Sequence, residues 1–98
     1  MNRQSVIDRL TQEQPNLRAL GLAGLSLFGS TARGQNRDGS DIDLAVTLDD
    51  RAQIDLFRFA AISERLSKVL GAKVDLIVEP ARSARMQAQI DRDRLRVF

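Results

Sequence analysis

Three short apolar runs, separated by a stretch with helical periodicity, constrain the fold of this chain most strongly. The runs cover Leu22 to Phe28, Asp41 to Leu48 and Val74 to Val78, and each has the length and composition of a β-strand. From Ala52 to Leu70, apolar residues recur three and four positions apart, which predicts a long amphipathic helix that ends at Gly71. This alternation predicts an α/β fold in which helices cover a small sheet, and it leaves the strand order open.

Shorter helical segments are predicted around these runs. Ser5 is a suitable N-cap for a helix over residues 5–14, and Pro15 interrupts or restarts that helix. One helical turn is expected over residues 30–34, followed by a polar loop, and a last helix is expected over residues 83–92. The chain shows no repeat, linker or low-complexity tract, so residues 1–98 are expected to form a single domain.

The residue content excludes several kinds of chemistry. The 98 residues include no cysteine and no histidine, which excludes disulfides, thiol nucleophiles and imidazole bases. A metal ion would therefore have to bind carboxylates. No apolar run reaches the roughly 20 residues that a membrane span needs, and the first residues lack the order of a signal peptide. A cytoplasmic protein with no membrane partner is expected.

The C-terminal stretch, residues 82–98, is basic, with five arginines and two aspartates, although the whole chain has a net charge of only +2. Such a stretch could contact phosphate or an acidic partner. The interleaved apolar residues favour a plainer interpretation, in which it is the solvated face of a terminal helix followed by a frayed end. The four phenylalanines are too few and too scattered for a platform that stacks bases, so direct nucleic-acid binding is not expected.

Asp41 and Asp43 form the first candidate site. On a strand, side chains alternate between the two faces, so both carboxylates point to one face while Ile42 and Leu44 point to the other. On a helix the same pair would diverge by roughly 200°. Two like charges this close require a compensating cation, and Mg²⁺ prefers hard oxygen ligands combined with substrate phosphates. The pair therefore predicts a magnesium site.

Asp75 supplies a third carboxylate, in a strand whose other residues are apolar. Three aspartates on neighbouring strands could bridge two metal ions roughly 3.5–4 Å apart, and one carboxylate could deprotonate the attacking group. For Asp75 alone, a solvated aspartate near a strand end is an equally good interpretation.

The Gly29-Ser30 pair and Arg33 are candidate phosphate-binding residues. Glycine allows a ligand to approach the backbone, and a helix that starts there directs free N–H groups at an anion. By itself, a Gly-Ser pair is more typical of a strand end followed by an N-cap serine. Arg33 could reach a phosphate or pair with the acidic cluster.

The combined arrangement is more specific than its parts. Gly29-Ser30, ten intervening residues and Asp41-x-Asp43, followed by Asp75 in a later strand, resemble the nucleotidyltransferase superfamily of the DNA polymerase β type. The string GSTARGQNRDGSDIDLAV is similar to the minimal nucleotidyltransferase (MNT) family, whose pattern is Gly-Ser-x-Ala-Arg-Gly, a short polar loop and Ser-Asp-x-Asp-Leu-x-Val. The motif shows no departure from this pattern.

The resemblance implies a fold and a set of roles. It implies a mixed sheet with helices packed on one side, and a site in which Gly29 and Ser30 hold the triphosphate of a nucleotide. Asp41 and Asp43 match the metal-binding pair of the family, and Asp75 matches its third carboxylate. These groups suffice to move a nucleoside monophosphate from a nucleoside triphosphate to a hydroxyl, because such transfer depends on positioning and charge neutralisation.

The resemblance also implies a partner. Many stand-alone members are antitoxins that bind a helical HEPN ribonuclease and can transfer AMP from ATP to one of its tyrosines. An adenylyltransferase antitoxin is therefore the leading hypothesis. A non-catalytic module that neutralises its partner is one alternative. The other is a small-molecule nucleotidyltransferase of the aminoglycoside-resistance kind, with its acceptor site built across an oligomer.

Overall fold

A computed structural model describes residues 1–37 and 39–98 of the chain. In chain order the elements are α1 (Arg3–Gln12), α2 (Gln14–Ala19), β1 (Leu22–Phe28), α3 (Gly29–Ala32), β2 (Ile42–Leu48), α4 (Leu56–Leu70), β3 (Val74–Val78), α5 (Ala84–Asp93) and β4 (Leu95–Arg96). Within these described ranges, no helix is long and apolar enough to span a membrane.

The four strands form one mixed sheet in the order β3-β2-β1-β4. β1 pairs antiparallel with both β2 and β4, whereas β2 and β3 are parallel. Two parallel strands need a long crossover connection, and here α4 provides it. The predicted fold class, an α/β arrangement with a small mixed sheet, is confirmed.

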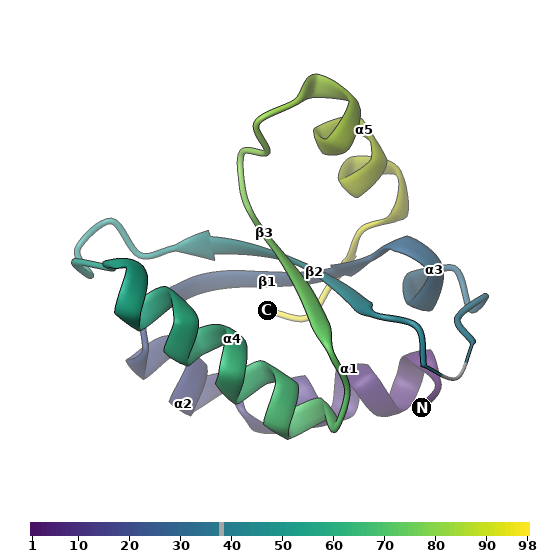
Figure 1. Ribbon diagram of the computed structural model, residues 1–98, viewed down its shortest axis with the longest axis horizontal. Helices are drawn as coiled ribbons and strands as arrows, with labels where there is room; N and C mark the ends of the chain where they lie inside the picture. Colours follow the sequence, from purple (N-terminus) through teal and green to yellow (C-terminus); the bar gives the residue numbers. More distant parts are fainter. Residues whose placement is uncertain (38) are drawn as a thin grey trace.

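Helices α1, α2 and α4 cover one face of the sheet, which we call the helix face (Figure 1). Alternation along the strands supplies its apolar side chains, as predicted: Ile42, Leu44 and Val46 of β2 all join this core. α4 adds a buried stripe with helical spacing, and α1 contributes two fully buried residues. The buried contributors from α1, α2 and α4 are Val6, Leu10, Leu17, Ile62, Leu66 and Leu70.

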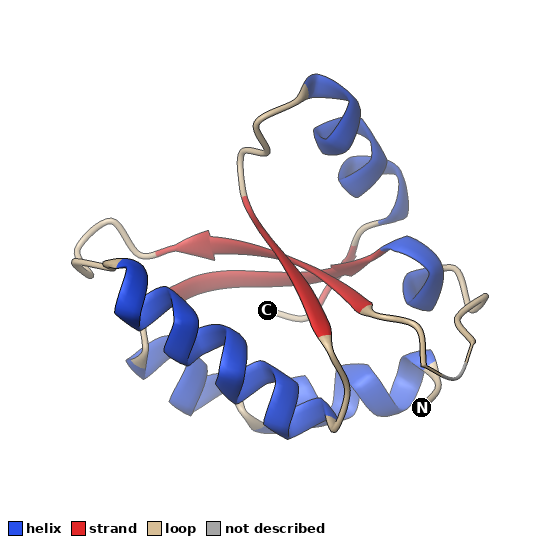
Figure 2. Ribbon diagram, in the orientation of Figure 1, coloured by secondary structure: helices blue, strands red, loops and turns tan. Residues whose placement is uncertain are grey.

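The opposite face of the sheet, which we call the α5 face, carries one helix over a small apolar cluster. Ile90 of α5 packs there with Phe28 and Ala45, and the three side chains are buried. Figure 2 shows α5 on the side of the strands away from α1, α2 and α4. The expectation of helices on one side only is therefore wrong in one respect, because the last helix covers part of the second face.

Side-chain caps move two predicted helix starts. Asn2, rather than Ser5, caps α1, and its side-chain oxygen accepts a hydrogen bond from the Ser5 N–H at 2.8 Å. α4 begins at Leu56 rather than Ala52, because the Asp55 carboxylate accepts the Arg58 N–H at 2.8 Å and fixes the first turn. The predicted end of α4 at Gly71 is confirmed, and this residue has the left-handed conformation that ends a helix.

The C-terminal segment differs most from its prediction. Instead of fraying, Leu95 and Arg96 pair with β1 as a short edge strand, and Phe98 is buried in the core. Arg94 lies between the helix and this strand and donates hydrogen bonds to Glu79 and to the Ser26 hydroxyl. The arginines of this segment therefore include one that fastens α5 and β4 to the sheet.

Candidate active site

Strand pairing brings two of the predicted carboxylates together. Asp43 of β2 and Asp75 of β3 are register partners on neighbouring parallel strands. Residues paired in this way project from the same face of the sheet, and for these two it is the α5 face. Asp43 is half-buried and Asp75 is exposed. The predicted alternation in β3, with Asp75 opposite to Val74 and Leu76, is confirmed.

Asp41 lies one residue before β2, not inside the strand as predicted, and it is exposed. Its charge still reaches the pair. Burial raises the pKa of the Asp43 carboxyl, and the charges of Asp75 and then Asp41 raise the pKa further, while Arg33 lowers it. The charges of Asp75 and Asp41 therefore both act on Asp43.

Gly29 follows β1 directly and lies against the Asp43 carboxylate. Phe28 is the register partner of Asp43, which places the end of β1 beside it. Gly29 is buried and has φ +73°, a conformation that favours glycine. A Cβ atom at this position would lie 2.1 Å from Asp43 Oδ2, so only glycine leaves the carboxylate in its place.

Ser30 is the second residue of α3, and it is not the N-cap. Phe28 occupies the cap position, and no side chain caps the first turn within the described part of the chain. The plainer interpretation of Gly29-Ser30, a strand end followed by an N-cap serine, is therefore wrong. α3 is held from its other end, where Arg3 Nη1 donates to the Ala32 carbonyl at 3.0 Å. The Ser30 side chain is left half-buried at the start of α3.

Arg33 ends α3 and joins the site electrostatically. Its Nη1 donates to Asp93 Oδ2 at 2.6 Å, and its Nε donates to Gln35 Oε1 at 3.1 Å. The same guanidinium lowers the pKa of Asp43. The sequence suggested a phosphate or the acidic cluster as its partner, whereas its ion pair in the structure is with Asp93 of α5, which lies outside that cluster.

Two of these contacts could not be inferred from local spacing. Arg3 and Ala32 are 29 residues apart, and Arg33 and Asp93 are 60 residues apart. Sequence analysis did not identify Arg3 or Asp93 as part of the site. The only signal for Asp93 is its place at the end of a helix among arginines, where a carboxylate needs a partner from elsewhere in the fold.

The donor set suits a hard cation that also binds a nucleotide. Among the described residues, no group of three or more acidic side chains is close enough to hold a metal ion by itself. Mg²⁺, however, is usually bound by one or two carboxylates with phosphates and water completing its coordination. The in-register pair Asp43 and Asp75, with Asp41 nearby, provides such a partial set, and burial first and then the charges of Asp75 and Asp41 raise the pKa of Asp43.

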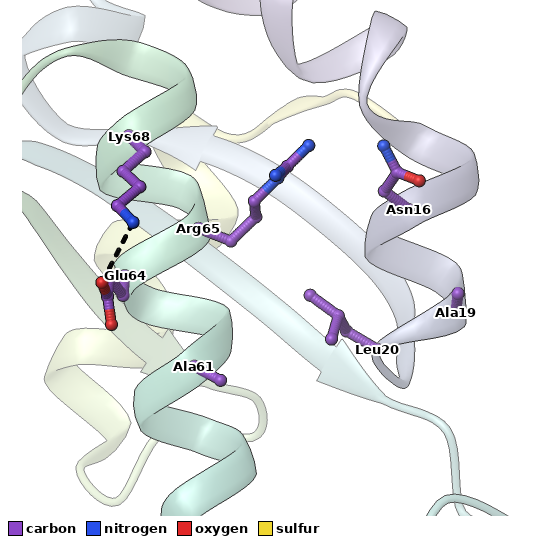
Figure 3. A pocket seen from close by; sticks show the side chains of 7 residues that line it. All are labelled: Asn16, Ala19, Leu20, Ala61, Glu64, Arg65 and Lys68. Carbon is purple, nitrogen blue, oxygen red and sulfur yellow. Dashed lines mark ion pairs between the residues drawn. The ribbon is translucent and has the colours of Figure 1, made fainter.

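A groove lies on the other side of the molecule, and its charged side chains are paired with one another or with neighbours. It has a volume of about 580 Å³ and lies between α2 and α4, on the helix face (Figure 3). Its charged residues are already paired, Lys68 with Glu64 at 3.3 Å and Arg65 with Glu13 at 2.8 Å. The residues lining it are Asn16, Ala19, Leu20, Ala61, Glu64, Arg65 and Lys68. This groove is not the candidate active site, because none of the predicted site residues lines it.

Comparison with known proteins decides the family. A family model described as a nucleotidyltransferase domain matches residues 6–97. The chain belongs to this family. Membership confirms the resemblance inferred from the Gly-Ser and Asp-x-Asp motifs, and it confirms the predicted enzyme class, nucleotidyltransferase.

Two curated relatives are named as protein adenylyltransferases. The chain is 42% identical over 55 residues to MJ1379 of Methanocaldococcus jannaschii, named as a candidate adenylyltransferase. This alignment covers 56% of this chain and 55% of the relative, so the chain spans about half of that protein's length. The chain is 32% identical over 71 residues to the protein adenylyltransferase MntA of Thermococcus cleftensis, covering 71% of this chain and 70% of MntA.

Solved structures confirm the fold. A minimal nucleotidyltransferase superposes with a TM-score of 0.81 and 27% identity, covering 97% of this chain and 95% of the other. An MNT antitoxin complex with a tri-AMPylated Shewanella oneidensis HEPN toxin gives a TM-score of 0.63 at 22% identity, over 90% of this chain and 68% of the matched chain. The predicted polymerase β-like fold of a minimal nucleotidyltransferase is therefore confirmed.

Proposed function

We propose that this chain is a Mg²⁺-dependent nucleotidyltransferase that moves AMP from ATP to a hydroxyl, most simply a tyrosine, of a HEPN-type helical toxin and thereby acts as its antitoxin. The observation that carries the proposal is the pairing of Asp43 with Asp75 in register, with Gly29 directly against the Asp43 carboxylate. Carboxylates on one sheet face beside a glycine turn provide a place for both metal and triphosphate.

The three aspartates have distinct parts in this proposal. Asp41 and Asp43 would hold Mg²⁺ together with Asp75, as two ions when nucleotide is bound. Bound Mg²⁺ would neutralise the negative charge of the triphosphate. Asp75, the more exposed of the two paired carboxylates, would accept the proton of the attacking hydroxyl. The hydroxyl oxygen then forms a bond to the α-phosphorus, and pyrophosphate leaves with the electrons of the broken bond.

The residues around α3 serve the triphosphate. Gly29 leaves space beside the backbone, and Ser30 offers a hydroxyl at the start of α3. Arg33 adds a positive charge that acts on Asp43. Since transfer of this kind depends on position and charge more than on covalent catalysis, these few groups are sufficient.

The partner is supported by relatives rather than by a contact in this chain. Two curated relatives are named as protein adenylyltransferases, and a structural neighbour is an MNT antitoxin in complex with an AMPylated HEPN toxin. A protein hydroxyl as acceptor fits these names better than a small molecule does. The leading hypothesis from the sequence is retained on this basis.

Intact mass spectrometry of a cognate HEPN-type protein tests the proposal. The partner is incubated with Mg·ATP and with the wild-type chain, Asp75→Asn or Asp50→Asn. Asp50 is exposed beyond the other end of β2, so its variant controls for the loss of a carboxylate. Addition of one or more AMP units with the wild type and Asp50→Asn, but not with Asp75→Asn, is expected. Tight binding without any adduct would favour a non-catalytic module that neutralises its partner.

A further inference from the structure

Asp93 is a nearly buried carboxylate that the proposed chemistry does not use. It is the last residue of α5, and its side chain is only 5% exposed. A carboxylate at the C-terminal end of a helix faces the negative end of the helix dipole, so helix stability does not explain its presence. Burial of a charge also requires a partner. The function of Asp93 must therefore be found in what it contacts.

Its main contact is Arg33. Asp93 Oδ2 accepts from Arg33 Nη1 at 2.6 Å, and the other oxygen, Oδ1, lies 3.5 Å from Arg92 Nε. Arg33 itself is 41% exposed, and Gln35 accepts from its Nε at 3.1 Å. Within the described part of the chain, no protein group accepts a hydrogen bond from Arg33 Nη2. Two of the three guanidinium nitrogens, Nε and Nη1, thus have protein partners, and Nη2 is the nitrogen left for another acceptor.

We infer that Asp93 is a positioning residue, which holds the Arg33 guanidinium so that its free Nη2 meets the triphosphate of the nucleotide. The planar guanidinium is suited to this arrangement, because its nitrogens donate in fixed directions and Nη2 can donate to a phosphate while Nη1 donates to the carboxylate. The inference rests on the triphosphate role proposed above for Arg33. It adds that α5, through its last residue, sets the position of a phosphate-binding group at the C-terminal end of α3.

A competing arrangement predicts the opposite change in nucleotide affinity when the Asp93 charge is removed. If Asp93 merely paired with Arg33 until a phosphate displaced the Asp93 carboxylate, removal of the Asp93 charge would strengthen nucleotide binding. If Asp93 only joined α3 to α5, its removal would lower stability without changing the affinity of the folded protein. Three outcomes are therefore distinct: weaker binding, stronger binding and unchanged binding.

Calorimetric titration with Mg²⁺ and a non-hydrolysable ATP analogue separates these outcomes. Asp93→Asn keeps the shape of the side chain and removes its charge. The matched control is Asp91→Asn on the same helix, since Asp91 contacts Arg94 and Gln87 rather than Arg33. Unfolding is measured for each variant, and affinity is expressed per folded molecule. Positioning predicts a loss of about tenfold for Asp93→Asn, the size of one charge-assisted hydrogen bond, and little change for Asp91→Asn.

A double-mutant cycle of Arg33 and Asp93 distinguishes positioning from a purely structural role, because only positioning couples the effects of the two residues on nucleotide affinity. Arg33→Gln should weaken binding, and adding Asp93→Asn to it should have no further effect. Arg33→Lys, which keeps the charge without the planar fork, should also lose affinity. Unchanged or tighter binding by Asp93→Asn, or independent effects in the cycle, would overturn the inference alone. Failure of the wild-type chain to bind the analogue would overturn the proposed function and this inference with it.

Discussion

The two faces of the sheet carry different kinds of side chain. The helix face buries apolar side chains from α1, α2 and α4, many of them with no exposed surface. The α5 face has a buried cluster of only Phe28, Ala45 and Ile90, and beside it Asp43 and Asp75 project from neighbouring strands. The helix face can therefore supply most of the stability, which leaves the α5 face free to carry charges that repel one another.

This division explains how a small domain tolerates an unfavourable cluster. The raised pKa of Asp43 shows that the folded protein disfavours its ionised form. Groups arranged for binding often reduce stability in this way, and the remainder of the fold has to compensate. Arg33–Asp93 and Arg94–Glu79 tie α5 to the site and to the sheet, so the second face depends on ion pairs where the first depends on apolar burial.

The largest effect is expected on the helix face. Leu66 in α4 has no exposed surface, so Leu66→Ala should lower the free energy of unfolding by about 2–5 kcal/mol. The control is Leu56→Ala in the same helix, where the side chain is 80% exposed and little change is expected. Urea unfolding measures both. Equal losses for the two variants would show that the stability of the domain is not concentrated in this core.

Gly29→Ala tests whether the glycine at the end of β1 is required for the site as well as for the fold. An alanine with positive φ costs about 1–2 kcal/mol, and its Cβ would also displace the Asp43 carboxylate. Gly71→Ala is the matched control, since Gly71 also has positive φ but has open space around its Cβ position. Gly29→Ala should lose more stability than the control and should also lose nucleotide affinity per folded molecule. A loss of stability alone would make Gly29 a structural turn.

Glu79→Gln tests the ion pair that fastens α5 and β4. Hydrogen bonds from Arg94 lower the pKa of the Glu79 carboxyl, so the folded state favours its ionised form. The resulting stability is present above the ordinary glutamate pKa and is lost as pH falls through the lowered value. Glu79→Gln should cost about 1 kcal/mol at neutral pH, more than Glu64→Gln in the exposed pair with Lys68. Chemical unfolding at neutral and acidic pH measures this cost. A cost that did not change with pH would exclude the ion pair as its origin.

The smallest effect concerns the acidic pair itself. Since the pKa of Asp43 is raised, the stability from its protonated form is present at low pH and is lost as pH rises through the value in the folded state. Asp43→Asn cannot undergo this loss. In metal-free buffer its stability should match or exceed that of the wild type, by a margin that grows as pH rises from the ordinary aspartate pKa through the raised value. Urea midpoints across this range measure the margin, and a variant that becomes relatively less stable with rising pH would contradict the repulsion.

Local sequence patterns predicted much of the fold. The bounds of β1 and β3 are those expected from their apolar runs, and the end of α4 is marked by Gly71. Local patterns failed where a side chain a few residues away changed the boundary, as Asp55 does for α4. They failed most for β4, because a two-residue strand is too short to show alternation and pairs with a segment almost 70 residues away.

The site was predictable to a similar degree and for similar reasons. The Gly29-Ser30 and Asp41-x-Asp43 motifs lie close together in the sequence, so their spacing indicates that they contribute to one site. Asp75 could be proposed because a carboxylate interrupts an apolar strand, but its register with Asp43 required strand order, which spacing does not give. Asp93 carried no local signal, since its contact with Arg33 depends on how α5 lies across the sheet.

We propose that the aspartates on the α5 face form a Mg²⁺-dependent nucleotide site. Calorimetric titration with a non-hydrolysable ATP analogue, with and without Mg²⁺, tests this claim most directly on the wild-type chain, Asp43→Asn and Asp50→Asn. We expect Mg²⁺-dependent binding by the wild type and by Asp50→Asn, and a loss of at least about tenfold in affinity for Asp43→Asn. Equal affinity for all three proteins, or binding that does not depend on Mg²⁺, would contradict the account.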